Sequence, residues 1–223
     1  MVTKQRELLK RDALVEPYRS LHARIFRGGG RNPGGKRVRT VLFTANALRE
    51  GCSTVAANLA IYLTQVETER VLLLELDPLH PPRKPAVPAP RNVGVTDLLA
   101  DEVVLEDALH EVAGTRLSVL AAGKLRDDLP ALLTAGALGG LVERLKGEFG
   151  FIVADGPPVS GLPPVASIAA HFDGVALVTQ ANETRRQVVQ RSLDTLKAAS
   201  SEVLGVVLTQ RKYFIPDWIY RRL

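Results

Sequence analysis

One stretch near the start of the chain runs from an apolar strand through a loop into a helix, and it limits the fold more than any other feature. Val38 to Thr44 is typical of a buried strand, and Ser53 to Gln65 carries apolar side chains at helical spacing. The loop between them ends in Gly51-Cys52-Ser53-Thr54. Such a loop surrounds phosphate oxygens with backbone N–H groups at the start of the helix. The stretch therefore predicts an α/β fold with a phosphate-binding loop.

The loop departs from the standard pattern GxxxxGK(S/T), in which the lysine contacts the β and γ phosphates and the hydroxyl binds Mg²⁺. Cys52 stands at the lysine position and Asn46 at the first glycine. Arg49 is the nearby cation that offers a replacement charge, but a guanidinium on a loop lacks the fixed geometry that this role needs. We expect weakened binding of ATP or ADP, and the predicted nucleotide-binding residues are Arg49, Glu50, Gly51, Cys52, Ser53 and Thr54.

The cysteine itself allows two interpretations. A thiol at a helix N-terminus tends to have a lowered pKa, and the resulting thiolate would repel phosphate and offer a redox switch. The alternative is that Cys52 is a small neutral side chain that remained after catalysis was lost.

Further apolar runs separated by helical patterns set the fold class. The predicted strands are 71–76, 117–121, 151–154, 175–179 and 203–208, and helical patterns cover 53–65, 128–146 and 184–198. Strands that alternate with helices predict a doubly wound, mostly parallel sheet with helices on both faces, as in P-loop NTPases. Ligands of such sheets lie at the carboxyl ends of the strands, where the altered loop falls.

Carboxylates follow two of these strands. Glu75 lies near the end of the run 71–76 and Asp77 follows it directly, and Asp155 directly follows the run 151–154. Acidic residues at strand ends beside a phosphate-binding loop are the usual ligands of Mg²⁺. The sequence therefore predicts a magnesium site made of Ser53, Glu75, Asp77 and Asp155, in which Asp77 and Asp155 carry any residual catalysis.

Composition bounds the remaining organisation. The single cysteine of this 223-residue chain agrees with a reducing compartment, and no apolar run approaches the roughly 20 residues of a membrane span. A cytoplasmic protein is expected. We predict an N-terminal basic helical arm with a glycine-rich connector at 1–35, an NTPase-like domain at 36–212 and an aromatic, basic tail at 213–223. Pro17 suits the first position of the helix in the arm.

The net charge of +5 is concentrated in the first forty residues. A solvated helix face is the commoner explanation of such charge, and no aromatic residues alternate with the basic ones to stack nucleic-acid bases. The sequence therefore argues against nucleic acid as a partner. The tail carries Trp218 beside Arg221 and Arg222, which leaves open a contact with a membrane surface or with a membrane protein.

Several motifs, in order along residues 14 to 212, resemble the bacterial tyrosine kinases of capsule and exopolysaccharide synthesis. This family lies within the deviant P-loop class that also holds the Min and Par ATPases. The matching segments are 16–21 (EPYRSL), 50–60 (EGCSTVAANLA), 74–78 (LELDP), 94–99 (GVTDLL), 120–123 (LAAG) and 155–159 (DGPPV). The resemblance implies a membrane-bound polysaccharide chain-length or co-polymerase protein as partner, at the inner face of the membrane.

The departures from the family pattern cluster at the nucleotide site. The resemblance implies lysine at Cys52, aspartate at Glu75 and aspartate at Pro164. It also implies several tail tyrosines as phosphate acceptors, where this chain offers Tyr213 and Tyr220, and an arginine at His22 for ring assembly. A homo-oligomer is thus left open.

Three functions follow from these observations. The first is a catalytically impaired, tyrosine-kinase-like protein that regulates polysaccharide polymerisation or export by binding. The second is an active but atypical ATP-dependent tyrosine autokinase that uses Arg49 or a cation from a neighbouring subunit. The third is a Min/Par-like positioning ATPase.

Overall fold

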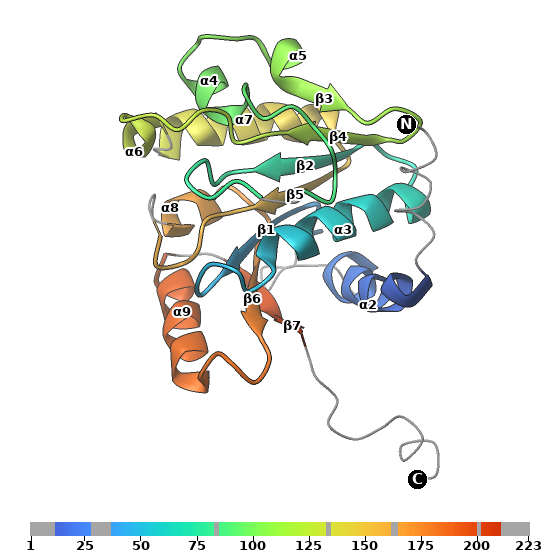
Figure 1. The fold of residues 1–223 in the computed structure, drawn as a ribbon, viewed down its shortest axis with the longest axis vertical. Coiled ribbons are helices and arrows are strands. Elements are labelled where there is room, and N and C mark those ends of the chain that lie inside the picture. Colours follow the sequence, from blue (N-terminus) through green and yellow to red (C-terminus); the bar gives the residue numbers. More distant parts are fainter. Residues whose placement is uncertain are drawn as a thin grey trace.

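The fold is a seven-stranded sheet with the order β3-β4-β2-β5-β1-β6-β7, flanked by helices (Figure 1). The computed structural model describes residues 12–27, 37–82, 85–132, 135–161, 165–199 and 202–210. The strands are β1 (Thr40–Ala45), β2 (Val71–Glu75), β3 (Leu109–Glu111), β4 (Leu117–Leu120), β5 (Phe151–Asp155), β6 (Gly174–Gln180) and β7 (Val203–Thr209). The predicted doubly wound, mostly parallel α/β class is confirmed.

All strand pairs are parallel except β3 with β4. The sequence did not predict β3, because a three-residue strand gives almost no periodic signal. Strand β5 lies between β2 and β1, with Glu75 opposite Asp155 and Phe43 opposite Asp155 in the two registers. These registers bring the ends of the three central strands to one edge of the sheet.

Alternation along the buried strands builds one apolar core on each face. Phe43 and Val41 of β1 pack on one side with helix α3 (Cys52–Val66), while Leu42 packs on the other side. Strands β2 and β5 divide in the same way. Both faces of a parallel sheet must be covered, so its strands are apolar at nearly every position.

Helices α2 (Asp12–His22) and α3 cover one face, and the later helices cover the other (Figure 1). The later helices are α4 (Val95–Leu99), α5 (Leu105–Ala108), α6 (Leu129–Leu132), α7 (Ala135–Glu148), α8 (Val165–Ala169) and α9 (Arg186–Ala198). The predicted helices 53–65 and 184–198 are confirmed as α3 and α9. The pattern at 128–146 corresponds to α6 and α7.

The predicted start of the first helix was wrong. Helix α2 begins at Asp12, so Pro17 lies inside the helix and not at its first position. Five helical residues precede this proline, so it removes the backbone N–H that would bond to the carbonyl four residues earlier, and the helix loses one hydrogen bond. A π-helical turn, Ala23–Arg27, follows α2.

His22 fixes this first helix to the domain. Its ring is buried, Nε2 lies 2.9 Å from Oε1 of Glu67, and the ring packs against Phe26 and Tyr62. Glu16 and Arg19 instead form an exposed ion pair at 3.2 Å. His22, which departs from the family's arginine, therefore belongs to the packing between α2 and α3.

Within the described residues, no helix combines the length and the apolar character needed to cross a membrane.

Candidate functional site

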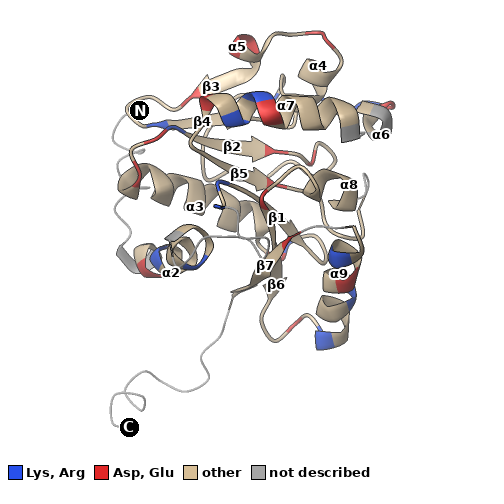
Figure 2. Ribbon diagram, turned by 180° about the vertical axis from the view of Figure 1, so that it is seen from behind, with Lys and Arg blue, Asp and Glu red and all other residues tan. Residues whose placement is uncertain are grey.

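A cavity of about 790 Å³ opens at the carboxyl ends of β1, β2 and β5. Every site residue predicted from the sequence lines it: Arg49, Glu50, Gly51, Cys52, Ser53, Thr54, Glu75, Asp77 and Asp155. The proline-rich segment that follows β2 supplies the opposite wall with Pro81, Pro82 and Pro85. Figure 2 shows the acidic residues at the tips of β2 and β5, on the same edge of the sheet.

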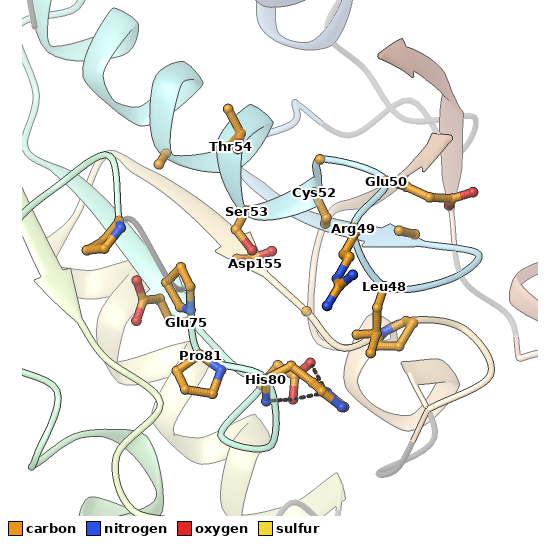
Figure 3. Close-up of a pocket in the computed structure, with 18 of the residues that line it drawn as sticks. Leu48, Arg49, Glu50, Cys52, Ser53, Thr54, Glu75, His80, Pro81 and Asp155 are labelled. Atoms are coloured by element: carbon orange, nitrogen blue, oxygen red, sulfur yellow. Dashed lines mark hydrogen bonds and ion pairs between the residues drawn. The ribbon is translucent and has the colours of Figure 1, made fainter. Parts of the chain in front are cut away.

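Backbone conformation and one buried carboxylate shape the loop. Arg49 and Gly51 both have positive φ, of 69° and 95°, and Gly51 caps α3. The buried Glu50 carboxylate accepts hydrogen bonds from the backbone N–H of Asn46 at 2.8 Å and of Ala47 at 3.3 Å, and from the Thr184 hydroxyl. Its side chain points away from Ser53 and Asp155 (Figure 3). Glu50 therefore holds the loop together and directs its charge away from the cavity centre.

We expect Glu50→Ala to destabilise the protein by about 2 kcal/mol, because the variant leaves the buried backbone and side-chain N–H groups of Asn46 without their acceptor. Urea unfolding followed by circular dichroism measures this change. Glu50→Gln is the matched control, since its amide oxygen retains part of the acceptor role and should lose about half as much stability. Equal stability of the alanine variant and the wild type would contradict this role for Glu50.

Cys52 and Ser53, in the first turn of α3, both donate hydrogen bonds to Asp155. Burial, followed by the negative charge of Asp155, raises the pKa of the Cys52 thiol well above its ordinary value. The predicted lowering of this pKa was therefore wrong, because desolvation and the surrounding carboxylates outweigh the helix N-terminus. The group at the lysine position is a neutral thiol, and a thiolate-based redox switch loses its physical basis.

Burial also raises the pKa of Asp155 to about 7, against the lowering effect of the hydrogen bonds from Ser53 and Cys52. Glu75 and Asp77 add to the increase through charge repulsion. The carboxylic acid at the end of β5 is therefore protonated in a large share of molecules near neutral pH.

Asp155→Asn should stabilise the protein by about 2 kcal/mol at pH 8 and by much less at pH 4.5. Because the folded-state pKa lies above the unfolded one, wild-type stability falls as pH rises from about 4 to about 7, and the amide removes this loss. Thermal unfolding across this pH range measures the difference. The exposed Asp107→Asn serves as control and should shift stability by less than about 0.5 kcal/mol at either pH. A gain that does not depend on pH would contradict the buried acid.

Glu75 is bound by a partner that the sequence did not reveal. Arg91 contacts both carboxylate oxygens of Glu75, with Nε to Oε2 at 2.9 Å and Nη2 to Oε1 at 2.7 Å. Its guanidinium also donates to the backbone carbonyls of Ala89 at 2.9 Å and Val87 at 3.3 Å. The two side chains are 19% and 7% exposed, so the ion pair is largely withdrawn from water. Arg91 lines the same cavity.

The Asp77 carboxylate likewise accepts hydrogen bonds from residues that follow it in the sequence. Its Oδ1 accepts the backbone N–H groups of Leu79 and His80 at 3.1 Å each, and its Oδ2 lies 3.1 Å from Nδ1 of His80. The His80 ring is half-exposed at the rim of the cavity, and neither His80 nor Arg91 was predicted as a site residue. The contacts of His80 with Asp77 and of Arg91 with Glu75 are visible only in the folded structure.

The predicted magnesium ligands come together, but their arrangement does not fit the ion. Mg²⁺ requires free oxygen donors in near-octahedral geometry. Both oxygens of Glu75 face a guanidinium, Asp77 accepts three donors, and Asp155 accepts two. No group of three or more histidine, cysteine, aspartate or glutamate side chains among the described residues is arranged to hold a metal.

The cavity retains features that suit a nucleotide phosphate. Cys52, Ser53 and Thr54 start α3 at the cavity wall, and the first N–H groups of a helix have no partners within the helix. Arg49 extends from the loop into the cavity (Figure 3). Arg49 and Arg91 are the only arginines or lysines among the described lining residues. The frame for phosphate is present, while the charge in the loop is carried by Arg49 and not by a lysine at the start of α3.

Other predicted features lie outside the described residues. They are the basic segment before residue 12, the connector 28–35, Pro164 and the whole tail with Tyr213 and Tyr220. These predictions stand as they were made.

Relatives by sequence are named as kinases and as a polysaccharide transport protein. Tyrosine-protein kinase CpsD of Streptococcus agalactiae is 29% identical over 177 residues, which cover 79% of this chain and 77% of CpsD. Succinoglycan biosynthesis transport protein ExoP of Rhizobium meliloti is 27% identical over 205 residues, 88% of this chain but 26% of ExoP. No family model matches the sequence.

Solved structures with a similar fold include bacterial tyrosine-kinase and Min-type proteins. The chimerical protein CapA2B2 has a TM-score of 0.79 and 23% identity, covering 88% of this chain and 84% of its own. The septum site-determining protein MinD of Pyrococcus horikoshii, complexed with Mg-ADP, has a TM-score of 0.62 and 21% identity, covering 82% and 76%. Together these matches confirm the resemblance to the bacterial tyrosine kinases and the P-loop, Min/Par-like fold.

Proposed function

We propose that this relative of the bacterial tyrosine kinases of capsule and exopolysaccharide synthesis is a catalytically impaired, kinase-like protein. It acts by binding, and it regulates polysaccharide polymerisation or export through a membrane-bound chain-length partner. The observation that carries the proposal is Cys52: a neutral thiol hydrogen-bonded to Asp155 stands where the phosphate-binding lysine belongs.

The loss of this charge weighs more on catalysis than on binding. A charge-assisted hydrogen bond to phosphate is worth about 1.5 to 3 kcal/mol, so its loss weakens binding about ten- to a hundredfold. Loss of a preorganised donor to developing charge lowers the rate about a hundred- to a thousandfold, and phosphoryl transfer depends mainly on such donors. We therefore expect weak binding of ATP or ADP and little turnover.

The partner is supported by the relatives and not by a contact in this chain. ExoP is named as a transport protein, and the present chain corresponds to about a quarter of it, so a related unit exists within a longer transport protein. By analogy, this chain would act at the inner face of the membrane beside a separate chain-length protein. A homo-oligomer and a contact of the tail with lipid belong to the same proposal.

Two assays test the proposal. Purified protein incubated with radiolabelled ATP should show neither autophosphorylation nor hydrolysis above background, and Asp155→Ala should change nothing. Robust turnover that Asp155→Ala abolishes would overturn the impaired assignment. Co-expression with a membrane-bound chain-length protein from the same genome should yield a complex, and failure to co-purify from detergent or nanodiscs would remove the regulatory role.

One observation favours a second candidate, an active but atypical autokinase. Arg49 extends into the cavity and offers a replacement charge. Tyr213 or Tyr220 would then accept phosphate. Mass spectrometry of the expressed protein decides: phosphorylated tail tyrosines that disappear in Arg49→Ala would support this candidate, and unmodified tyrosines without turnover would remove it.

A further inference from the structure

We propose that the ion pair of Glu75 and Arg91 takes the place of a divalent cation at the base of the cavity, so that this protein binds its anionic ligand without Mg²⁺. The inference rests on the proposed function, because it concerns the metal requirement of the same cavity. Its test uses no nucleotide, so the two can fail separately.

The geometry of the pair excludes the metal from Glu75. The guanidinium makes a two-point contact with the carboxylate, at 2.9 Å and 2.7 Å, and bidentate pairs of this kind are among the strong arrangements for these groups. A cation that approached either oxygen would meet a fixed positive charge on the same carboxylate. Backbone contacts also hold the pair in place, because the Arg91 guanidinium donates hydrogen bonds to the carbonyls of Ala89 and Val87. Arg91 therefore cannot leave Glu75 without losing backbone contacts as well.

The length of the residue at position 75 makes the pair possible. The strand places this side chain opposite Asp155, at the end of β2. Glutamate is one methylene longer than aspartate, and both of its oxygens meet Arg91 from the segment that ends the proline-rich loop. A shorter carboxylate at this position would not reach both nitrogens with the backbone unchanged.

The remaining acids do not form a metal site without Glu75. Asp77 is held by the backbone N–H groups of Leu79 and His80 and by the His80 ring. Within the part of the chain that the structure describes, no three potential ligands of the histidine, cysteine and carboxylate kind are arranged around one point. The charge of Arg91 is balanced by Glu75, so the net positive charge that faces an incoming anion comes from Arg49, which lines the same cavity.

Electron paramagnetic resonance of Mn²⁺ with the nucleotide-free protein tests the inference. Wild type should leave Mn²⁺ free in solution, whereas Arg91→Gln should bind it at least about tenfold more tightly, because a buried carboxylate is released for the metal. Glu75→Asp should gain binding as well, since the shorter side chain releases the guanidinium. The gain of Arg91→Gln should disappear in the Glu75→Gln/Arg91→Gln double variant.

Arg126→Gln is the matched control. Arg126 also contacts two carboxylates, those of Glu102 at 2.7 Å and Asp128 at 3.1 Å, but it lies outside the cavity. Its replacement should leave Mn²⁺ binding at the wild-type level. The inference is overturned if wild type binds Mn²⁺ as tightly as Arg91→Gln, or if neither Arg91→Gln nor Glu75→Asp, shown to be folded by circular dichroism, gains a bound ion.

Discussion

Replacement of Cys52 by lysine should tighten ADP binding by about ten- to a hundredfold, because it restores a charge-assisted hydrogen bond between the phosphate-binding loop and the nucleotide phosphates. The site is otherwise ready for this side chain. Position 52 is in the first turn of α3, at the wall of the cavity, and its present hydrogen bond to Asp155 shows that a donor there faces the acid at the end of β5. Isothermal titration calorimetry with ADP measures the change.

The gain in turnover should be much smaller than the gain in affinity. Glu75 remains paired with Arg91, and Asp155 sits beside Glu75 and Asp77, so the new ammonium will be attracted partly to these acids. Cys52→Ser is the matched control, since it keeps a small neutral donor and should leave ADP affinity within about threefold of wild type. Full kinase activity in Cys52→Lys would show that the lysine position alone accounts for the impairment. An ADP affinity equal to that of the wild type would contradict the assignment of this loop as the phosphate-binding site.

The fold was largely predictable from local pattern. Buried strands such as 71–76 and 151–154 are continuous apolar runs, and the helices between them are long enough for a clear 3.6-residue period. The failures concern elements whose local signal is short or ambiguous. The three-residue β3 lies below the length at which alternation can be recognised, and Pro17 favours a helix start, although the structure places it inside α2.

The candidate site was predictable where it depends on strand ends. The loop and the acids Glu75, Asp77 and Asp155 follow strands, and parallel strands bring their ends together regardless of what lies between them. Arg91 was missed because it reaches Glu75 from 16 residues along the chain, through a segment without periodicity. The thiol pKa was predicted in the wrong direction because its sign depends on burial and on three-dimensional neighbours, which the sequence does not show.

Arg91→Ala should destabilise the protein by about 3 kcal/mol, because it leaves the Glu75 carboxylate buried without its partner. Glu75 is 7% exposed, so water can replace only part of the lost interaction. Glu75→Gln introduced into the Arg91→Ala background should recover about half of the loss, since the buried charge is then removed. Urea unfolding of the two single variants and the double variant gives the coupling between the side chains.

Arg126→Ala provides the comparison that separates a buried pair from an exposed one. The partners of Arg126 are 47% and 54% exposed, and exposed pairs contribute about 0 to 1 kcal/mol. If Arg91→Ala costs no more than Arg126→Ala, the pair adds little to the folded state, and Arg91 would be free to move toward a phosphate. A large coupling free energy means that Glu75 and Arg91 stay paired under native conditions. This part of the cavity then has the same arrangement before and after a ligand binds.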